Sequence, residues 1–171
     1  MASLAQRLGF SRYDADQRYR AGLAAFAARD RRSAIAELRA AIKLLPTHAE
    51  YHAALGLLLL EDKRKADADA AFDEALRLNP YEALANYGQG MIAYRAKDWA
   101  AAETCFFQAL AAQPERAEAQ YYMAMVQHRL GQNAEALDWM RAAAAAFAAK
   151  NDKREKHCRA WMREFETLRM P

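Results

Sequence analysis

The sequence predicts an all-α protein built as a stack of similar helical hairpins, and two observations carry that prediction. The chain of 171 residues is rich in Ala, Leu, Arg and Glu and has only 6 Gly and 4 Pro. Strong helix formers are therefore abundant and helix breakers are scarce. In addition, Pro46, Pro80 and Pro114 recur at intervals of 34 residues, and a fixed period of this size indicates a repeat array.

Four further sets of residues keep the same interval, two of them small and alanine-only, one small and mixed, and one large and apolar. Small residues let two antiparallel helices approach closely, while the large apolar set fills the space between neighbouring hairpins. Agreement of all four sets by chance is remote, so the repeat defines the fold. The sets are Gly22, Gly56, Gly90 and Ala124; Ala34, Ala68, Ala102 and Ala136; Ala41, Ala75, Ala109 and Ala143; and Leu38, Phe72, Phe106 and Met140.

These residues resemble the tetratricopeptide repeat family, whose pattern has a small residue midway along the first helix, two alanines flanking a bulky residue in the second, and a closing proline. The resemblance covers about Asp14 to Ala148. It implies an all-α, right-handed superhelical stack of four hairpins with a C-terminal capping helix. The sequence departs from the pattern at Gln89, which stands where repeats two and four carry Leu55 and Met123; at Ala148, which replaces the last closing proline; and at Arg18, His52, Asn86 and Gln120, where the family often has an aromatic residue.

Helix caps and breakers set the expected boundaries. We expect hairpins at 12–28 with 31–44, 48–61 with 65–78, 82–96 with 99–112, and 116–130 with 133–148. The chain then divides into an N-terminal segment (1–11), a four-repeat domain (12–148) and a C-terminal capping helix (149–171).

The C-terminal helix is predicted from an amphipathic pattern over 151–169. A repeat array exposes an apolar face at each end, so this helix should cover the last hairpin. The alternative is that its apolar side docks a partner or a second copy of the chain. That side carries Cys158, Trp161, Met162, Phe165 and Leu168.

Charge and cysteine content exclude several classes of protein. The net charge of +3, from 25 basic and 22 acidic residues, is too balanced for the basic face that nucleic-acid binding needs. Cys105 and Cys158 lack metal-ligand or redox spacing and are expected to be reduced thiols. The N-terminus has no signal-peptide core, and the apolar run at 57–60 is too short to cross a bilayer. We therefore expect a soluble cytoplasmic protein with neither nucleic acid nor membrane as partner.

No catalytic constellation is found. None of the three serines lies in a nucleophile elbow, and Gly88 and Gly90 form a G-x-G inside a predicted helix, where it cannot cradle a phosphate. His48 and His52, four residues apart with Glu50 between them, are the best metal candidate, but no third ligand is evident. We expect no enzymatic activity, no cofactor and no metal site.

The most informative residues lie on the predicted first helices. In this family, the first helices line a concave groove that takes extended peptides or a partner helix. Tyr and Met are typical of adaptable binding surfaces, although several of these side chains could instead pack between adjacent first helices, Leu23 and Leu57 above all. Three sets map to the groove, namely Tyr19, Ala53, Tyr87 and Tyr121; Leu23, Leu57, Met91 and Met125; and Phe26, Leu60, Tyr94 and His128. The candidate groove residues are Tyr19, Leu57, Tyr87, Gly88, Met91, Tyr94, Tyr121, Tyr122, Met125 and His128.

The two glycines in the first helix of the third hairpin are expected to have different roles. Gly90 belongs to the small-residue set, so it should be needed for packing. Gly88 belongs to no such set, and its missing side chain should leave a pocket for an anchor residue of the ligand. Gly88→Leu would then leave the melting temperature unchanged or higher while weakening binding.

The partner is expected to be a protein or peptide segment with apolar anchors. Relatives that capture the C-terminal carboxylate of heat-shock chaperones use Lys, Asn and Arg, whereas Tyr19, Leu23, Ala54, Leu84 and Gly88 stand at those positions here. The leading prediction is therefore an adaptor that binds such a segment.

Two alternatives remain open. One is a chaperone resembling the translocator-binding class of type III secretion, although those proteins tend to be acidic with three repeats and this chain has a pI of about 8.9. The other is a self-assembling scaffold that uses the cap or the segment with Leu4, Leu8 and Phe10.

Overall fold

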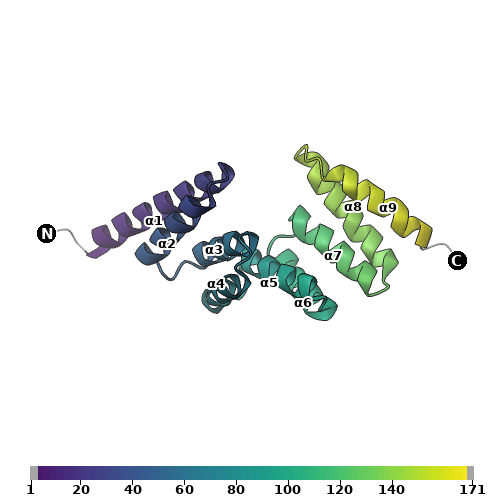
Figure 1. Ribbon diagram of the computed structural model, residues 1–171, viewed down its shortest axis with the longest axis horizontal. Coiled ribbons are helices and arrows are strands. Elements are labelled where there is room, and N and C mark those ends of the chain that lie inside the picture. The colour runs from purple at the N-terminus through teal and green to yellow at the C-terminus, as the bar shows by residue number, and fades with distance from the viewer. Residues whose placement is uncertain (1–3, 169–171) are drawn as a thin grey trace. The chain divides into compact units, whose positions relative to one another are not determined.

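The structure is a computed structural model that describes the backbone of residues 4–168 and the side chains of residues 12–168. Over this range every regular element is a helix, as predicted (Figure 1). The helices are α1 (Leu4–Ala27), α2 (Arg31–Leu44), α3 (Ala49–Glu61), α4 (Lys65–Leu78), α5 (Ala83–Ala96), α6 (Trp99–Ala112), α7 (Ala117–Arg129), α8 (Asn133–Ala149) and α9 (Glu155–Leu168).

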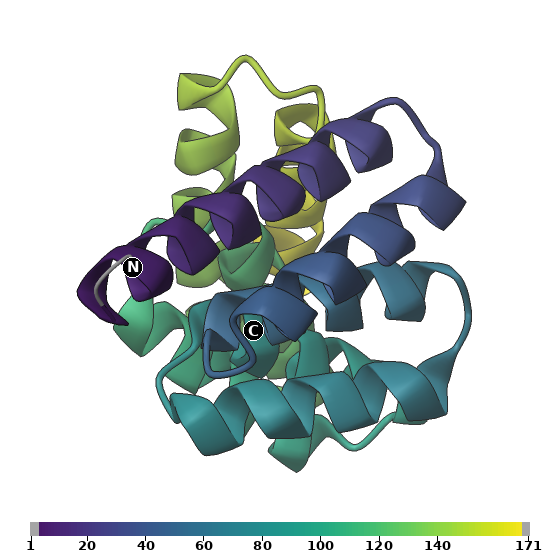
Figure 2. The same cartoon turned by 90° about the vertical axis from the view of Figure 1, so that its left-hand side faces the viewer.

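The helices pair in sequence order, so the predicted four hairpins and C-terminal helix are confirmed. Helix α1 packs on α2, α3 on α4, α7 on α8 and α8 on α9; Figure 2 shows α1 and α2 side by side as an antiparallel pair. The chain forms two compact units, an N-terminal unit (Met1–Gly88) and a C-terminal unit (Gln89–Pro171), which are described separately below.

Every hairpin turns at the same position of the repeat. Arg29, Lys63 and Lys97 have φ of 63° and Gly131 has φ of 81°, which is the left-handed conformation that commonly ends a helix. The next residue is the N-cap of the second helix, and in two hairpins it is an aspartate whose side chain caps that helix. Asp30 accepts a hydrogen bond from the Ser33 backbone N–H and Asp98 accepts one from Ala101, which satisfies one otherwise unpaired donor of each helix.

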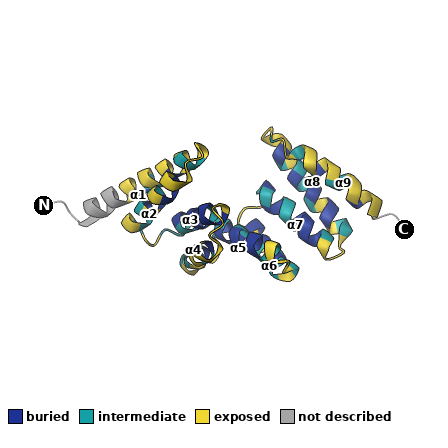
Figure 3. Ribbon diagram, viewed as in Figure 1, coloured by how far each residue is buried: buried dark blue, intermediate teal, exposed yellow. Residues whose placement is uncertain are grey.

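The small-residue set packs against the large apolar set of the same hairpin. A Cβ atom placed on Gly56 would come within 3.0 Å of three ring atoms of Phe72, and one on Gly90 equally close to Phe106. Both rings are fully buried. In Figure 3, buried segments are dark blue and exposed segments are yellow. Glycine at these positions therefore permits the two helices of each hairpin to approach.

Helix α9 closes the C-terminal unit. Cys158 and Phe165 are fully buried against Met140 and Phe147 of α8. Cys158 also continues the series Gly22, Gly56, Gly90 and Ala124 at the 34-residue interval. This helix thus takes the place that the first helix of a further hairpin would have.

In three of the four hairpins, the polar residue at the family's aromatic position fixes the loop before the first helix. His52 lies 2.8 Å from the carbonyl oxygen of Pro46 through Nε2, Asn86 donates to that of Pro80 at 3.1 Å, and Gln120 donates to that of Pro114 at 2.7 Å. The same side-chain to backbone bond therefore recurs with the repeat.

Two helices begin several residues away from the predicted start, and one side chain differs from the prediction in its exposure. Helix α1 begins at Leu4 rather than Arg12, because 4–8 are good helix formers and no proline stops them. Helix α9 begins at Glu155 rather than 151, since Asn151 is left-handed (φ 52°) and ends α8. Leu168 was placed on the apolar side of α9 but is 48% exposed. The suggested contacts of Leu4, Leu8 and Phe10 concern side chains outside the described residues.

Candidate functional site

In the N-terminal unit, tyrosines of consecutive first helices stack on each other. The Tyr19 ring of α1 lies 5.0 Å from that of Tyr51 of α3, and His48 stacks on Tyr51 at 4.2 Å. Tyr51 is buried and Tyr19 is half-buried. One part of the Tyr19 ring, which was predicted to bind a partner, therefore packs between first helices, and the other part stays accessible.

Carboxylates hold the hydroxyl groups of these tyrosines. Tyr19 donates a hydrogen bond to Glu50 at 2.7 Å, and Tyr51 donates one to Asp16. Burial, the bond to Glu50 and the charges of Glu50 and Glu82 raise the pKa of Tyr19 well above its usual range. The pKa of Tyr51 is raised in the same way, by burial and by Asp16. Both hydroxyls are therefore neutral donors at physiological pH.

The space beside Gly88 is filled, so the pocket predicted there is wrong. A Cβ atom on Gly88 would come within 2.6 Å of three ring atoms of Phe72. Phe72 is fully buried, and its ring is wedged between Gly56 of α3 and Gly88 of α5. Gly88 is thus required for packing, just as Gly90 is, and the contrast that we predicted between the two glycines does not hold.

In the C-terminal unit the tyrosines form a connected cluster. Tyr94 of α5 makes edge contacts with Trp99 of α6 at 5.4 Å and with Tyr122 of α7 at 5.3 Å. Tyr122 in turn stacks on Phe106 at 5.7 Å and meets Tyr121 edge to face at 5.4 Å. Burial raises the pKa of Tyr121 and Tyr122 above the ordinary value, so these hydroxyls also stay protonated.

Helix α9 covers the end of this cluster. The ring of Trp161 in α9 lies 6.0 Å from the ring of His128, which is 5.0 Å from that of Phe165, and Trp161 and Tyr121 pack against the same core cluster. His128 also shares a hydrogen bond of 2.8 Å with Asn133 through Nδ1. Part of the predicted binding surface of α7 is therefore occupied by the chain's own last helix.

The predicted residues fall into two groups by exposure. The half-buried group, which keeps accessible surface, consists of Tyr19, Leu57, Tyr87, Tyr94, Tyr121, Tyr122 and His128. The buried group consists of Gly88, Met91 and Met125. Sequence reasoning missed Tyr51, Trp99 and Trp161, which complete the two clusters. The helical spacing of Trp161 with Phe165 was visible, but not that this side would reach α7.

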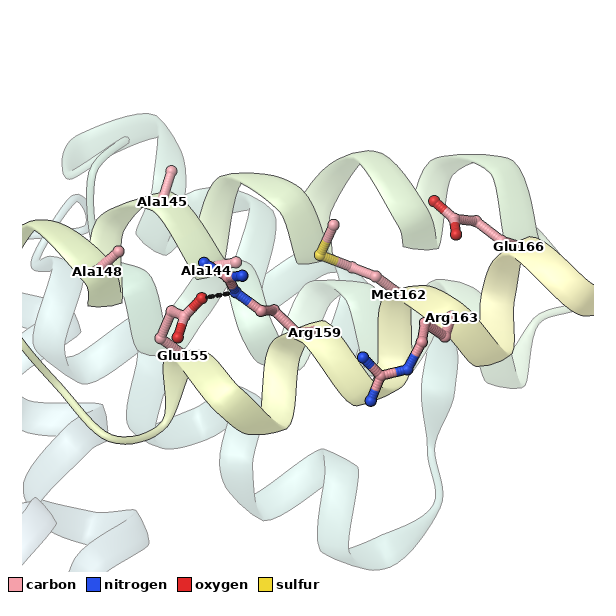
Figure 4. Close-up of a pocket in the computed structure, with 8 residues that line it drawn as sticks. All are labelled: Ala144, Ala145, Ala148, Glu155, Arg159, Met162, Arg163 and Glu166. Carbon is pink, nitrogen blue, oxygen red and sulfur yellow. Dashed lines mark hydrogen bonds and ion pairs between the residues drawn. The ribbon is translucent and has the colours of Figure 1, made fainter.

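The described residues also bear on two other kinds of site, a metal site and a ligand cavity. Over the described residues no group of three or more His, Cys, Asp or Glu side chains could hold a metal ion. A separate hollow of about 380 Å³ lies between α8 and α9, with Ala144, Ala145, Ala148 and Met162 as its apolar part and an ion pair of Glu155 with Arg159 at its edge (Figure 4). It contains none of the predicted binding residues.

Comparison with known proteins identifies the family. The sequence profile of the tetratricopeptide repeat family matches residues 19–83, 65–110 and 87–151. These matches cover well over half of the chain, which therefore belongs to the tetratricopeptide repeat family. No curated protein matches the chain in sequence. None of the helices within the described range is long and apolar enough to cross a membrane.

Solved structures of the same fold share little sequence with this chain. The pilF protein of Pseudomonas aeruginosa is similar with a TM-score of 0.69 and 20% identity, over 92% of this chain and 76% of pilF. The first tetratricopeptide domain of Spaghetti (RPAP3), bound to the HSP90 peptide SRMEEVD, has a TM-score of 0.65 and 17% identity over 70% of this chain and 98% of its own. The tetratricopeptide domain of Arabidopsis OM64 has a TM-score of 0.62 and 20% identity, over 71% of this chain and 98% of the OM64 domain. At these identities the likeness shows the fold alone.

Proposed function

We propose that this chain is an interaction module that binds a segment of another protein on the half-buried aromatic side chains of its first helices. One observation carries the proposal: each unit holds tyrosine rings that are fixed by ring contacts on one side and remain partly accessible on the other. Such rings offer apolar area that is already ordered, together with a polar hydroxyl, so little conformational entropy is lost on binding.

The segment is expected to carry apolar anchors rather than a terminal carboxylate. The RPAP3 domain binds an HSP90 peptide, but here Tyr19, Leu23 and Gly88 stand at three of the positions where carboxylate-binding relatives need Lys, Asn or Arg. In addition, the Tyr19 hydroxyl is already used by Glu50, a negative charge that would repel a carboxylate.

A peptide selection tests the proposal. A random peptide library displayed on phage is panned against the wild-type chain and counter-selected with Tyr94→Asp, which places a charge in the tyrosine cluster. We expect enrichment of peptides that carry aromatic, Leu or Met residues. Recovery of no peptide that distinguishes the two proteins would refute the proposal, provided that the variant keeps its helical circular dichroism.

A further inference from the structure

The outer side of α6 differs from the exposed side of every other helix over the described residues. None of its exposed residues is ionisable. Each of the other helices exposes at least one charged side chain, for example Arg95 on α5 and Arg129 on α7. The exposed residues of α6 are Ala100, Thr104, Phe107, Gln108, Ala111 and Ala112.

The repeat shows that this lack of charge is not required by the fold. Phe107 is 63% exposed, whereas the same position of the other second helices holds Arg39, Asp73 and Arg141. An exposed charged side chain thus occupies this position in three hairpins out of four. The exposed Phe107 ring and the exposed alanines of α6 together form an apolar patch, and a contiguous patch of this kind, unlike a single exposed ring, indicates an interaction surface.

Four of the exposed residues form one straight seam, three of them apolar and one a threonine. Ala100, Thr104, Phe107 and Ala111 follow each other at intervals of four, three and four residues, which is the spacing of a helix-pairing seam. Thr104 donates its hydroxyl hydrogen to the Ala100 carbonyl oxygen at 3.1 Å. Its polar group is therefore satisfied inside the helix and does not oppose burial.

We propose that α6 pairs with α6 of a second copy of the chain, antiparallel about a two-fold axis between residues 105 and 106. This order is self-complementary, because each end of the seam is Ala and each Phe107 then faces the small Thr104 of the other copy. A seam without charges meets its own copy without like-charge repulsion. A parallel pair would instead set Phe107 against Phe107 and leave gaps at the alanines.

The dimer should be weak. Each copy contributes one helix of 14 residues, so the buried area lies at the small end of protein interfaces. We expect dissociation constants in the micromolar range, so that the mass rises from monomer to dimer between about 1 and about 500 µM. This surface involves none of the tyrosines of the proposed binding function, and the two proposals can fail independently.

Sedimentation equilibrium over this concentration range provides the first test. Phe107→Arg introduces the residue that α2 and α8 carry at this position, so the fold should tolerate it, and it should weaken dimerisation at least about tenfold. Arg39→Glu is the matched control, at the same position of α2, and should leave the dimer intact. A wild-type chain that stays monomeric throughout, or a dimer that Phe107→Arg does not weaken, would overturn the proposal.

Disulfide trapping tests the register. In a Cys105→Ser background, a chain with Ala100→Cys and Ala111→Cys should form a covalent dimer on oxidation, since each new thiol faces the other one across the axis. Ala100→Cys alone should not, because the two copies of residue 100 would be about 16 Å apart along the helices, beyond the ~7 Å between Cα atoms that a disulfide allows. Equal cross-linking of the single and double variants would contradict the antiparallel pair.

Discussion

The contact between Gly88 and Phe72 gives a prediction with a defined sign and size. A Cβ atom on Gly88 would overlap three ring atoms of Phe72, and ordinary contact starts only at 3.4 Å, so the ring would have to move by about 1 Å. Gly56 blocks it on another side. Overpacking of this kind costs about 1–3 kcal/mol, and alanine recovers about 1 kcal/mol through helix propensity. Gly88→Ala should therefore destabilise by about 1 kcal/mol.

A double-mutant cycle separates this contact from propensity. The first hairpin and its neighbour carry Leu38 and Ala54 at the positions of Phe72 and Gly88, so Phe72→Leu combined with Gly88→Ala reproduces a pair that the chain already uses. The smaller side chain leaves room for the methyl group. The double variant should hence be more stable than the sum of the single effects by at least about 1 kcal/mol.

Urea unfolding followed by circular dichroism at 222 nm measures this coupling. Phe72→Leu with Gly22→Ala is the matched control, because Gly22 contacts Leu38 and not Phe72. That pair should be additive within about 0.5 kcal/mol. Additivity of the Gly88 pair as well would refute the packing argument.

Four further outcomes are expected. Lys97→Gly replaces a lysine in the left-handed conformation and should raise the free energy of unfolding in urea by up to about 1 kcal/mol. A lower urea midpoint would contradict this. Asn86→Ala loses two hydrogen bonds at a position that is 2% exposed, so unfolding should need about 1–3 kcal/mol less; an unchanged midpoint would show that the loop does not depend on it. Truncation after Ala149 exposes the apolar side of α8 and should cause association in light scattering or loss of cooperative melting, whereas an unaltered monomer would make α9 a dispensable tail. Burial raises the pKa of the Cys158 thiol to about 11, above the value near 8.5–9 that a thiol has in the unfolded chain, so its contribution to stability is complete below that value and is lost as the pH rises towards 11. Cys158→Ala should flatten this part of the plot of unfolding free energy against pH, and identical plots for the two proteins would contradict it.

The repeat made most of the fold predictable. The glycines and alanines at fixed intervals predict helix packing correctly, because each one permits the two helices of its own hairpin to approach closely. The packing role of Gly88 could not be predicted in this way, because the side chain that it accommodates, Phe72, belongs to the preceding hairpin. At the equivalent place in the C-terminal unit, Tyr122 stacks on Phe106 instead. Residue size at this position is thus set by a neighbour and does not repeat.

The binding residues were predictable in part. Sequence spacing placed Tyr19, Tyr94 and Tyr121 on the first helices, but it could not show how much of each ring is used by packing. That depends on Tyr51 and Trp161, which approach from other helices. The continuation of the small-residue set to Cys158 was a signal in the sequence that α9 would pack as a further first helix.

The affinity of a selected peptide for three purified proteins tests the central claim most directly. Isothermal titration would compare wild type with Tyr94→Asp and with Arg39→Asp, whose site is exposed on α2. If the first-helix tyrosines bind the segment, the dissociation constant should rise at least about tenfold for Tyr94→Asp and stay unchanged for Arg39→Asp. Equal affinity of all three proteins, or a loss confined to Arg39→Asp, would contradict the claim.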